Sequence, residues 1–274
     1  PVWRARTVLT VHDLSYFHFP RMLQGPLSRF YWLTLCPSTW KKATRILCVS
    51  ESTRMDLIQT LHLPEEKISA ILSGTPDDIH FVPESRWNPS LLPVYRDYLL
   101  YVGTLEERKN LLVLLKAYTL LQNRNIAPPL LIVGEDRTLY GRQMRQYVSE
   151  HLSGTPIYCL GVLAREHLSE IYSRAQLFIS PSVSEGFGFC PLEAMKCGIP
   201  CVVSRIPAHQ EVLQDSAEFF SPHNPEELAF VIEKLLTDTQ LRQQYIQKGR
   251  MRTEQLTWEK TAEHTAELYF SLLK

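Results

Sequence analysis

The feature that most constrains the fold is a repeated unit in which a short apolar run ends at a glycine or polar turn and a helix follows. The second half of the chain contains such runs at residues 98–102, 130–133, 157–160, 177–179 and 199–204. Uninterrupted apolar strands of this length are typical of parallel sheets, whose two faces are both covered by helices. Because strand–helix–strand crossovers are right-handed, the alternation predicts a doubly wound α/β fold.

A glycine-rich stretch, SPSVSEGFGFCPLEAMKCG, contains the predicted site. Gly186 and Gly188 leave the backbone around Phe187 open to the approach of a ligand. Pro191 predicts the first position of a short helix, and Gly198 lies just past its end. The unpaired N–H groups at such a helix start suit a phosphate or another anion.

Two carboxylates, Glu185 and Glu193, flank this turn with seven residues between them. Two glutamates at this spacing do not by themselves indicate a site, because Glu is common and the helix dipole favours it in a first helical turn. Here the pair follows an apolar strand and encloses the segment GFGFCPL. The context therefore favours two site carboxylates over two solvated side chains.

Polar side chains also follow two other predicted strands, at the edge where parallel sheets bind ligands. His12 and Asp13 follow a strand near the N-terminus, and Arg108 and Lys109 lie in a turn of the second half. A lone histidine at a strand end is usually satisfied by its neighbours, and a Glu-Arg-Lys cluster is usually solvated. The functional interpretation is that the cations neutralise a diphosphate leaving group.

Several other functions lack their motifs. No turn contains GxGxxG or GxxxxGK[ST], so a dinucleotide-dependent dehydrogenase and a P-loop NTPase are poorly supported. His12 and Asp13 would need further His and Asp ligands at helical spacing to form a metal phosphohydrolase site. An Asp-x-Asp metal clamp is missing as well, because Asp77 and Asp78 are adjacent and outside the predicted site. We therefore expect neither a metal ion nor a cofactor.

Composition limits the partners and the compartment. The 29 Lys and Arg residues balance 29 Asp and Glu residues, so no overall charge favours nucleic acid or an anionic membrane. The six cysteines form no C-x-x-C pair, which favours a reduced, cytoplasmic protein. No signal peptide opens the chain, and no apolar run approaches the roughly 20 residues of a membrane span. We expect at most peripheral contact at the inner face of a membrane.

Two further segments of the first half are predicted to be helical. Residues 15–42 are rich in aromatic side chains, which predicts a long helix against the core or a surface facing an amphipathic acceptor, with packing favoured. Ser50 is predicted to cap the helix that follows it. Arg54 in that helix suits a solvated face.

Four segments carry a resemblance to a known family: the glutamate pair around the turn, the TVH strand, the VSESTRMDL segment and the GTLEERKN turn. Through them the chain resembles the retaining GT-B glycosyltransferases of family 4. The likeness extends from about residue 8 to the C-terminus. It implies two doubly wound, Rossmann-like domains that move a sugar from a nucleoside diphosphate sugar to an acceptor hydroxyl with retention. The GTLEERKN turn resembles that of bacterial polysaccharide mannosyltransferases, which implies GDP-mannose as donor. A saccharide or a lipid-linked saccharide is the implied acceptor.

The resemblance also implies roles for individual residues. The implied catalytic residues are His12, which would orient the sugar, Lys109 on the diphosphate, and Glu185 on the sugar hydroxyls. The implied donor-binding residues are Gly103, Thr104, Arg108, Val162, Gly186, Phe187, Gly188 and Glu193. Among these, Glu193 would hold the ribose hydroxyls and Val162 would contact the base. The likeness of the VSESTRMDL segment makes Arg54 an implied acceptor-side or phosphate contact, with the solvated face as the alternative. Many relatives carry an arginine where this chain has Thr104, so some phosphate contacts must come from elsewhere.

The expected domains are an acceptor-side domain over residues 1–90, a nucleotide-sugar domain over 91–256, and a closing helix over 257–274 anchored by Trp258. The strand before His12 comes late in the first domain of relatives, and the chain opens at Pro1, so we expect the first domain to be incomplete. A longer chain or a partner chain would complete it. Alternatively, the piece is a nucleotide-sugar-binding remnant without transferase activity. A phosphorylase of the same architecture would need a pyridoxal lysine environment, which the sequence does not show.

Overall fold

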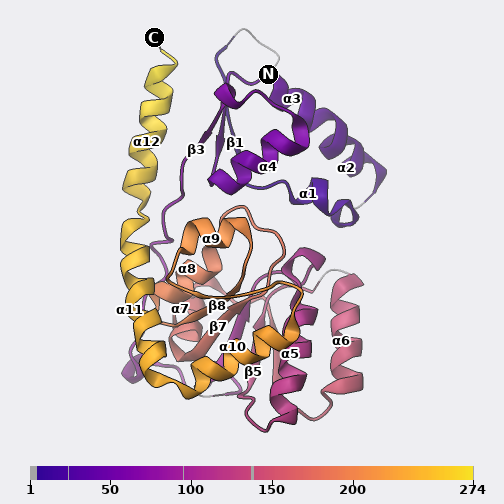
Figure 1. The fold of residues 1–274 in the computed structure, drawn as a ribbon, viewed down its shortest axis with the longest axis vertical. Coiled ribbons are helices and arrows are strands. Elements are labelled where there is room, and N and C mark those ends of the chain that lie inside the picture. Colours follow the sequence, from indigo (N-terminus) through magenta and orange to yellow (C-terminus); the bar gives the residue numbers. More distant parts are fainter. Residues whose placement is uncertain (1–4, 24, 95, 137–138, 274) are drawn as a thin grey trace.

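Two separate parallel sheets organise the chain (Figure 1). The computed structural model describes residues 5–23, 25–94, 96–136 and 139–273. The first sheet has the order β1-β2-β3 and the second has the order β6-β5-β4-β7-β8-β9. Every neighbouring pair in both sheets runs parallel. The predicted α/β fold with two parallel sheets is confirmed.

The strand order of the second sheet determines where its site lies. The first-sheet strands are β1 (Val8–Val11), β2 (Arg45–Cys48) and β3 (Ile68–Ala70). The second-sheet strands are β4 (Tyr98–Val102), β5 (Leu130–Val133), β6 (Ile157–Gly161), β7 (Ala175–Ser180), β8 (Cys201–Ser204) and β9 (Glu218–Phe220). From β4 the chain builds outward to β6 and then returns to add β7 on the other side of β4. Ligands bind at such a reversal point, beyond the carboxyl ends of the strands.

The core of the second domain lies on both faces of its sheet. Tyr98 and Leu100 point to one face, and Leu99 and Tyr101 point to the other, as the two-residue period of a strand requires. The helices that follow β4 are α5 (Leu111–Asn123), α6 (Leu139–His151), α7 (Arg165–Arg174), α8 (Phe189–Lys196), α9 (Pro207–Leu213), α10 (Pro225–Thr237) and α11 (Thr239–Gln255). Side chains of α7 and α8 cover the first face, and those of α5 and α10 cover the second. Each fully buried large apolar side chain contributes about 1.5–3 kcal/mol.

The first domain departs from the single long helix predicted over residues 15–42. The segment forms α1 (Ser15–His18), α2 (Pro26–Phe30), a π-helical turn at Tyr31–Leu35 and α3 (Cys36–Lys42). Pro20 and Pro26 explain the break between α1 and α2, because proline has no N–H to donate to the preceding turn. Pro37 has the same effect at the π-helical turn, which α3 follows without a gap. Trp40 is buried, but Phe30 and Tyr31 are 56% and 52% exposed. The packing interpretation is therefore wrong for those two aromatic residues.

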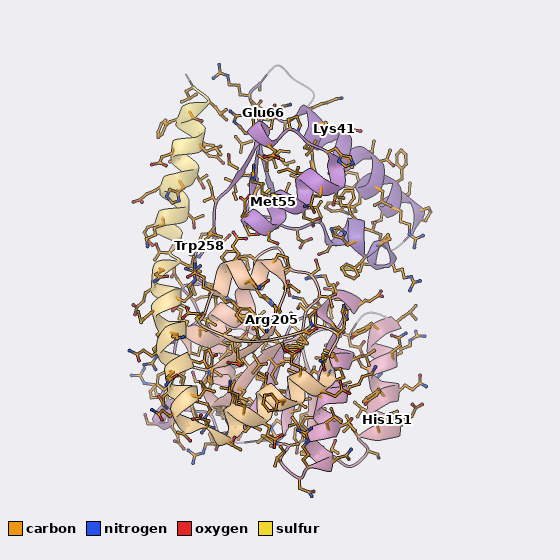
Figure 2. The ribbon with its side chains drawn as sticks, in the orientation of Figure 1. Lys41, Met55, Glu66, His151, Arg205 and Trp258 are labelled. Atoms are coloured by element: carbon orange, nitrogen blue, oxygen red, sulfur yellow. The ribbon has the colours of Figure 1, made fainter. Side chains whose placement is uncertain are left out.

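Two elements connect the domains. α4 (Glu51–Leu61) follows β2, and its predicted cap is present, because the Ser50 hydroxyl accepts a hydrogen bond from the Thr53 N–H. α12 (Trp258–Ser271) continues from α11 past the second domain and runs beside β3 (Figure 1). There the Thr261 hydroxyl donates to the carbonyl of Leu72 at 2.8 Å. Trp258 lies at the start of α12 (Figure 2). Its ring stacks on Phe189 with centroids 6.5 Å apart, and it is 42% exposed. The proposed domain boundaries at residues 90 and 256 stay predictions.

Candidate functional site

The candidate site is a cavity between the two domains, at the reversal point of the second sheet. Its volume is about 230 Å³. The residues along its wall that carry the argument are His12, Asp13, Arg108, Lys109, Glu185 and the turn from Gly186 to Gly188. His12 and Asp13 follow β1, whereas the other residues follow β4 and β7. The carboxyl ends of strands from both sheets therefore meet at one cavity.

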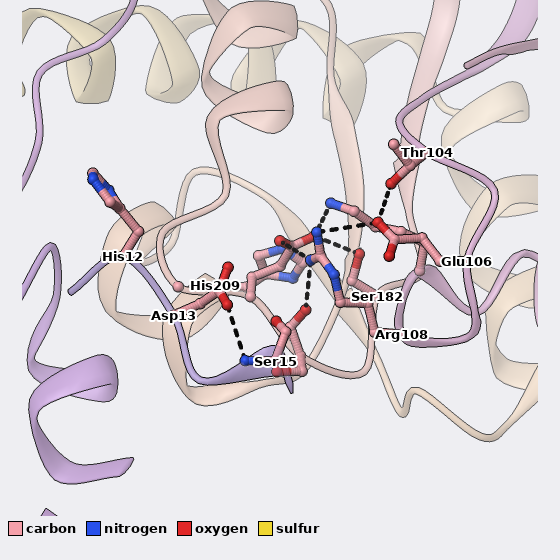
Figure 3. A network of polar contacts seen from close by, with 12 residues as sticks. His12, Asp13, Ser15, Thr104, Glu106, Arg108, Ser182 and His209 are labelled. Carbon is pink, nitrogen blue, oxygen red and sulfur yellow. Dashed lines mark hydrogen bonds and ion pairs between the residues drawn. The ribbon is translucent and has the colours of Figure 1, made fainter. Parts of the chain in front are cut away.

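An ion cluster around Glu185 lies on this wall (Figure 3). Its Oε1 is 2.5 Å from Lys109 Nζ, and its Oε2 is 3.0 Å from Arg108 Nη1. The Ser182 hydroxyl also donates to Oε1, at 2.6 Å. Burial opposes ionisation of this carboxyl, but Lys109 and Arg108 outweigh it and hold the pKa of Glu185 at about 2. The site thus contains a largely buried carboxylate, its side chain 10% exposed, whose two cations come from the neighbouring strand end.

The turn that carries both cations is tied to the loop after β7. Asn110 adopts φ of 52° and closes the turn before α5. Its side-chain amide donates to the carbonyls of Pro181 and Pro222, at 3.2 and 2.6 Å. The Val183 N–H donates to the carbonyl of Arg108 at 2.8 Å. These bonds hold the cationic turn against the loop that carries Glu185.

Gly103 and Thr104 lie beside the cluster and do not line the cavity. The Thr104 hydroxyl donates to the carboxylate of Glu106, and Glu106 also pairs with Arg108 at 3.4 Å (Figure 3). Burial works against protonation of Arg108, but Glu185 and then Glu106 outweigh it and raise the pKa of the guanidinium. The structure therefore connects Thr104 to the cluster through Glu106. Donor contacts by Gly103 and Thr104 stay predictions.

Glu193 belongs to a second polar cluster, buried on α8. Tyr172 donates to its Oε2 at 2.8 Å, and Arg165 Nη1 lies 2.7 Å from its Oε1. Arg165 also forms two bonds with Asp78, at 2.7 and 2.9 Å. Asp78 is thus joined to Glu193 through one arginine, and it does not line the cavity. Only 3% of Glu193 is exposed, so it is not a solvated surface residue.

The glycine turn differs from the prediction in two details. α8 begins at Phe189, so Pro191 is its third residue and Glu193 its fifth. The predicted helix start at Pro191 and the placement of Glu193 in the first turn are therefore wrong. Proline tolerates any first-turn position, because N–H groups there have no helical acceptor anyway. Gly188 precedes α8 with φ of 95°, a conformation that favours glycine.

The space in front of Gly186 is occupied by the first domain. A Cβ atom at Gly186 would lie 1.8 Å from the carbonyl oxygen of His12. The absent side chain therefore permits contact with the end of β1. The approach of a ligand to the backbone around Phe187 stays a prediction. Among the residues that the structure describes, the N–H groups at 187–190 have no acceptor. These groups are free to bind an anion in the cavity.

Two predicted site residues lie apart from the ion cluster. His12 lines the cavity, but its exposed imidazole points away from Arg108 (Figure 3). Val162 is 70% exposed and lies on a different cavity of about 780 Å³, bordered by β6 and α6. The structure brings Arg108, Lys109 and Glu185 into contact. The sugar-orienting role of His12 and the base contact of Val162 stay predictions.

Sequence reasoning missed four side chains of the site: Tyr172, Arg165, Ser182 and His209. Arg165 is a cation after a strand end, and the reasoning that selected Arg108 could have found it. Tyr172 lies on the apolar stripe of its helix, and this pattern predicts packing in the core rather than a polar contact. His209 is fully buried, and its Nδ1 lies 3.0 Å from the Ser204 carbonyl. Burial, opposed by Glu185, lowers the pKa of its imidazole.

Within residues 5–23, 25–94, 96–136 and 139–273, no three His, Cys, Asp or Glu side chains gather in a way that could hold a metal ion. The helices in this described part are all too short or too polar to cross a membrane.

The fold and the site together define a glycosyltransferase of the GT-B type. The structure resembles sucrose-phosphate synthase from Thermosynechococcus elongatus over 99% of this chain and 69% of that one, with 24% identity and a TM-score of 0.81. It also resembles Anabaena Alr3699/HepE, solved in complex with UDP and glucose, over 98% of this chain and 72% of that one, with 20% identity and a TM-score of 0.82.

The chain belongs to the family described as glycosyl transferases group 1, which residues 87–252 match. Residues 2–78 match glycosyltransferase family 4. The chain is 31% identical to O-antigen chain mannosyltransferase B of Escherichia coli, over 96% of this chain and 70% of that protein. It is 27% identical to the serotype-specific mannosyltransferase WbdA of Escherichia coli, of which it spans 34%. The predicted family is confirmed.

Proposed function

We propose that the protein transfers mannose from GDP-mannose to a saccharide hydroxyl with retention of the anomeric configuration. The observation that carries the proposal is the Lys109–Glu185–Arg108 cluster at the reversal point of the sheet, beside the start of α8. A leaving diphosphate gains negative charge, which cations and preorganised N–H groups stabilise. Lys109 and the free N–H groups of the turn would bind this diphosphate, and no metal ion would be needed.

The two glutamates would hold the sugar and the nucleoside. Glu185 would accept hydrogen bonds from sugar hydroxyls, since an ionised carboxylate has acceptor positions beyond its bonds to cations. Glu193 would accept from the ribose hydroxyls in the same way. Arg165 and Tyr172 hold the Glu193 carboxylate in one orientation. The base would extend toward Val162.

In the proposed step, the bond between the anomeric carbon and the diphosphate oxygen breaks as the acceptor oxygen bonds to the same face of that carbon. The acceptor hydroxyl proton passes to an oxygen of the departing diphosphate. No covalent intermediate with the protein forms, so retention needs no nucleophilic side chain. Lys109 would stabilise the diphosphate, and His12, which reaches the cavity from the first domain, would contact the sugar.

A neighbouring cavity between the domains suits the acceptor. It has a volume of about 640 Å³. It shares Glu185 with the candidate-site cavity of about 230 Å³, which we call the donor cavity. Its wall combines apolar surface from Phe19 and Met55 with the carboxylates of Asp56 and Glu211. Apolar side chains can pack against the C–H face of a sugar ring, and carboxylates can accept hydrogen bonds from its hydroxyls. The wall therefore suits a saccharide. Since the two cavities meet at Glu185, a hydroxyl placed there could reach the donor sugar.

The relatives support mannose and a polysaccharide product. One relative is named an O-antigen chain mannosyltransferase, and another a serotype-specific mannosyltransferase. A structural neighbour was solved with UDP and glucose, so UDP-glucose is the competing donor to test.

We further propose peripheral contact with an anionic membrane through α2 and the following π-helical turn. Residues 14–50 contain five Lys and Arg residues and no Asp or Glu. Leu27, Phe30 and Tyr31 on this segment are 84%, 56% and 52% exposed. Exposed apolar and aromatic side chains beside basic ones are the pattern of an interfacial helix. A membrane-bound, lipid-linked saccharide would then be within reach of the acceptor cavity.

The alternative function is nucleotide-sugar binding without turnover. One observation favours it: among the residues described, the outer edge of β1 has no partner strand. Another chain, or further residues of this one, would then complete the acceptor-side sheet.

A two-part experiment separates these functions. The purified protein is mixed with GDP-mannose or UDP-glucose, and binding is measured by calorimetry. Release of nucleoside diphosphate is then measured with mannose-terminated saccharides as acceptors, and the product anomer is assigned by NMR. We expect binding of GDP-mannose and an α-linked product from its α-configured donor. Binding without product would support the alternative, and binding of neither donor would contradict both.

A further inference from the structure

The beginning of α4, in the first domain, contacts the glycine turn of the second. Two hydroxyls donate to the carbonyl oxygen of Gly186: Ser50 Oγ at 2.5 Å and Thr53 Oγ1 at 3.1 Å. Ser50 is fully buried and Thr53 is 3% exposed. Both bonds join residues more than 130 positions apart in the chain. They lie inside the protein at the point where the domains meet.

These bonds fix the orientation of one peptide group. No described peptide bond is cis, and in a trans peptide the C=O and N–H point in opposite directions. With the Gly186 carbonyl held toward α4, the N–H of Phe187 must point away from α4. Phe187 lines the donor cavity, and its N–H has no acceptor among the described residues. The first domain therefore determines where a free N–H of the turn is directed.

The contact also requires glycine at position 186. As described above, a side chain there would collide with the carbonyl oxygen of His12. The Cβ of Asp13 would be 3.1 Å away as well. The end of β1 and the start of α4 thus hold the same peptide from two sides, and substitution of Gly186 would separate them.

A carboxylate from the second domain holds α4 in this position. Glu211 of α9 accepts a bond from the Glu51 N–H at 2.7 Å and one from the Ser52 N–H at 2.8 Å. These are first-turn N–H groups, which have no acceptor within their own helix. The negative charge also complements the positive end of the helix dipole. α4 is therefore joined to the second domain through Glu211 as well as through Gly186.

We infer that Ser50 and Thr53 are positioning residues for the donor, acting from the domain opposite to the one that binds it. By fixing the Gly186 carbonyl, their hydroxyls align the N–H of Phe187 for an anionic oxygen of the nucleoside diphosphate. Glu211 supports the arrangement by holding α4. Separation of the domains breaks both hydroxyl bonds, so donor affinity and domain closure are coupled. This inference rests on the proposed function.

The test uses Thr53→Val, which removes a hydroxyl and keeps the shape of the side chain. Thr53→Ser restores the hydroxyl. Thr261→Val is the matched control, because it also removes a hydroxyl-to-carbonyl bond between α12 and the first domain, away from the turn. Dissociation constants for GDP and GDP-mannose are measured by calorimetry, and thermal melts check that each variant is folded. In parallel, the amide resonances of Phe187 and Gly188 are followed in ¹⁵N-labelled protein without ligand.

We expect Thr53→Val to weaken donor binding by about 2- to 10-fold, the range for loss of one hydrogen bond. Thr53→Ser and Thr261→Val should stay close to the unsubstituted protein. The amide resonances of Phe187 and Gly188 should shift in Thr53→Val and not in Thr261→Val. Equal donor affinities and equal resonances in the two valine variants would overturn the inference. If the unsubstituted protein binds no nucleoside diphosphate, the proposed function fails separately, and the ligand-free resonances still decide whether Thr53 orients the peptide.

Discussion

Lys109 Nζ lies 2.5 Å from Oε1 of Glu185, although the two residues are 76 positions apart in the chain. The contact forms because β4 and β7 are neighbours at the reversal point of a parallel sheet, so the turns that follow them meet. This pair places a cation and a carboxylate beside the start of α8, where the proposed diphosphate would bind.

Replacement of Lys109 with alanine should abolish most turnover. Loss of one group that stabilises the developing charge on a leaving group costs about 10²- to 10³-fold in rate. Initial rates of nucleoside diphosphate release measure this effect. Lys248→Ala is the control, since Lys248 pairs with Asp215 at the protein surface, away from the site. Near-normal turnover in Lys109→Ala would remove the assignment of this lysine.

Glu185 should make stability depend on pH in the acid range. Its pKa falls from an ordinary value of 4.5 to about 2 in the folded protein. A depressed folded-state pKa adds stability above the unfolded-state value, and that stability is lost as the pH falls from about 4.5 toward 2. The contribution is on the order of 3 kcal/mol. Urea denaturation at pH 5 and pH 3 measures the larger part of this contribution, because the rest is lost only below pH 3.

Glu185→Gln serves as the comparison for this pH effect, because glutamine keeps the shape and cannot ionise. We expect the loss of unfolding free energy between pH 5 and pH 3 to be smaller in the glutamine variant. Identical losses in the two proteins would show that Glu185 does not titrate at a depressed pKa.

Tyr172→Phe should weaken binding of the donor. The substitution removes the hydroxyl that donates to Glu193 Oε2 and leaves the ring in the core. We expect donor affinity to fall by about 2- to 10-fold with little change in kcat, because a ribose contact is equal in the ground and transition states. Steady-state kinetics with varied GDP-mannose separates KM from kcat. A lower kcat at unchanged KM would argue against a ribose-binding role for Glu193.

Phe30→Ser should reduce binding to anionic vesicles. Removal of an exposed aromatic side chain takes apolar area out of the proposed membrane contact. Co-sedimentation with phosphatidylglycerol vesicles measures binding, and phosphatidylcholine vesicles test the role of charge. Phe230→Ser is the matched control, because Phe230 is 62% exposed on α10 of the other domain. Equal vesicle binding by the two variants would exclude α2 as the contact.

Turnover should persist in excess EDTA. We expect Lys109, Arg108 and the start of α8 to supply the charge stabilisation that other transferases obtain from a divalent ion. Rates with EDTA and with added Mg²⁺ or Mn²⁺ test this expectation. Loss of activity in EDTA that is restored by one of these ions would contradict it.

The parallel sheets were predictable because fully buried strands appear as uninterrupted apolar runs. That the turns after β4 and β7 lie at one edge of the sheet followed from the same pattern, since carboxyl ends of parallel strands share one edge. This is why Arg108, Lys109 and Glu185 could be selected from sequence. Their mutual ion pairs, however, depend on strand order, which local pattern does not determine.

The features that sequence reasoning missed involve long-range contacts or local competition. The contact of Gly186 with His12 and Ser50 joins two domains, and nothing near Gly186 in the sequence indicates it. The sequence pattern predicts Tyr172 as a core residue, because its ring is buried and only its hydroxyl contacts Glu193. The helix start at Phe189 was mistaken because proline is compatible with more than one first-turn position.

The central claim is that the Lys109 cluster binds the diphosphate of a nucleotide sugar, and titration calorimetry with GDP and with guanosine tests it most directly. We expect GDP to bind the unsubstituted protein at least 10-fold more tightly than guanosine, a difference in binding free energy of about 1.4 kcal/mol. Lys109→Ala should remove most of this difference. Equal affinities for GDP and guanosine, or an unchanged difference in Lys109→Ala, would contradict it.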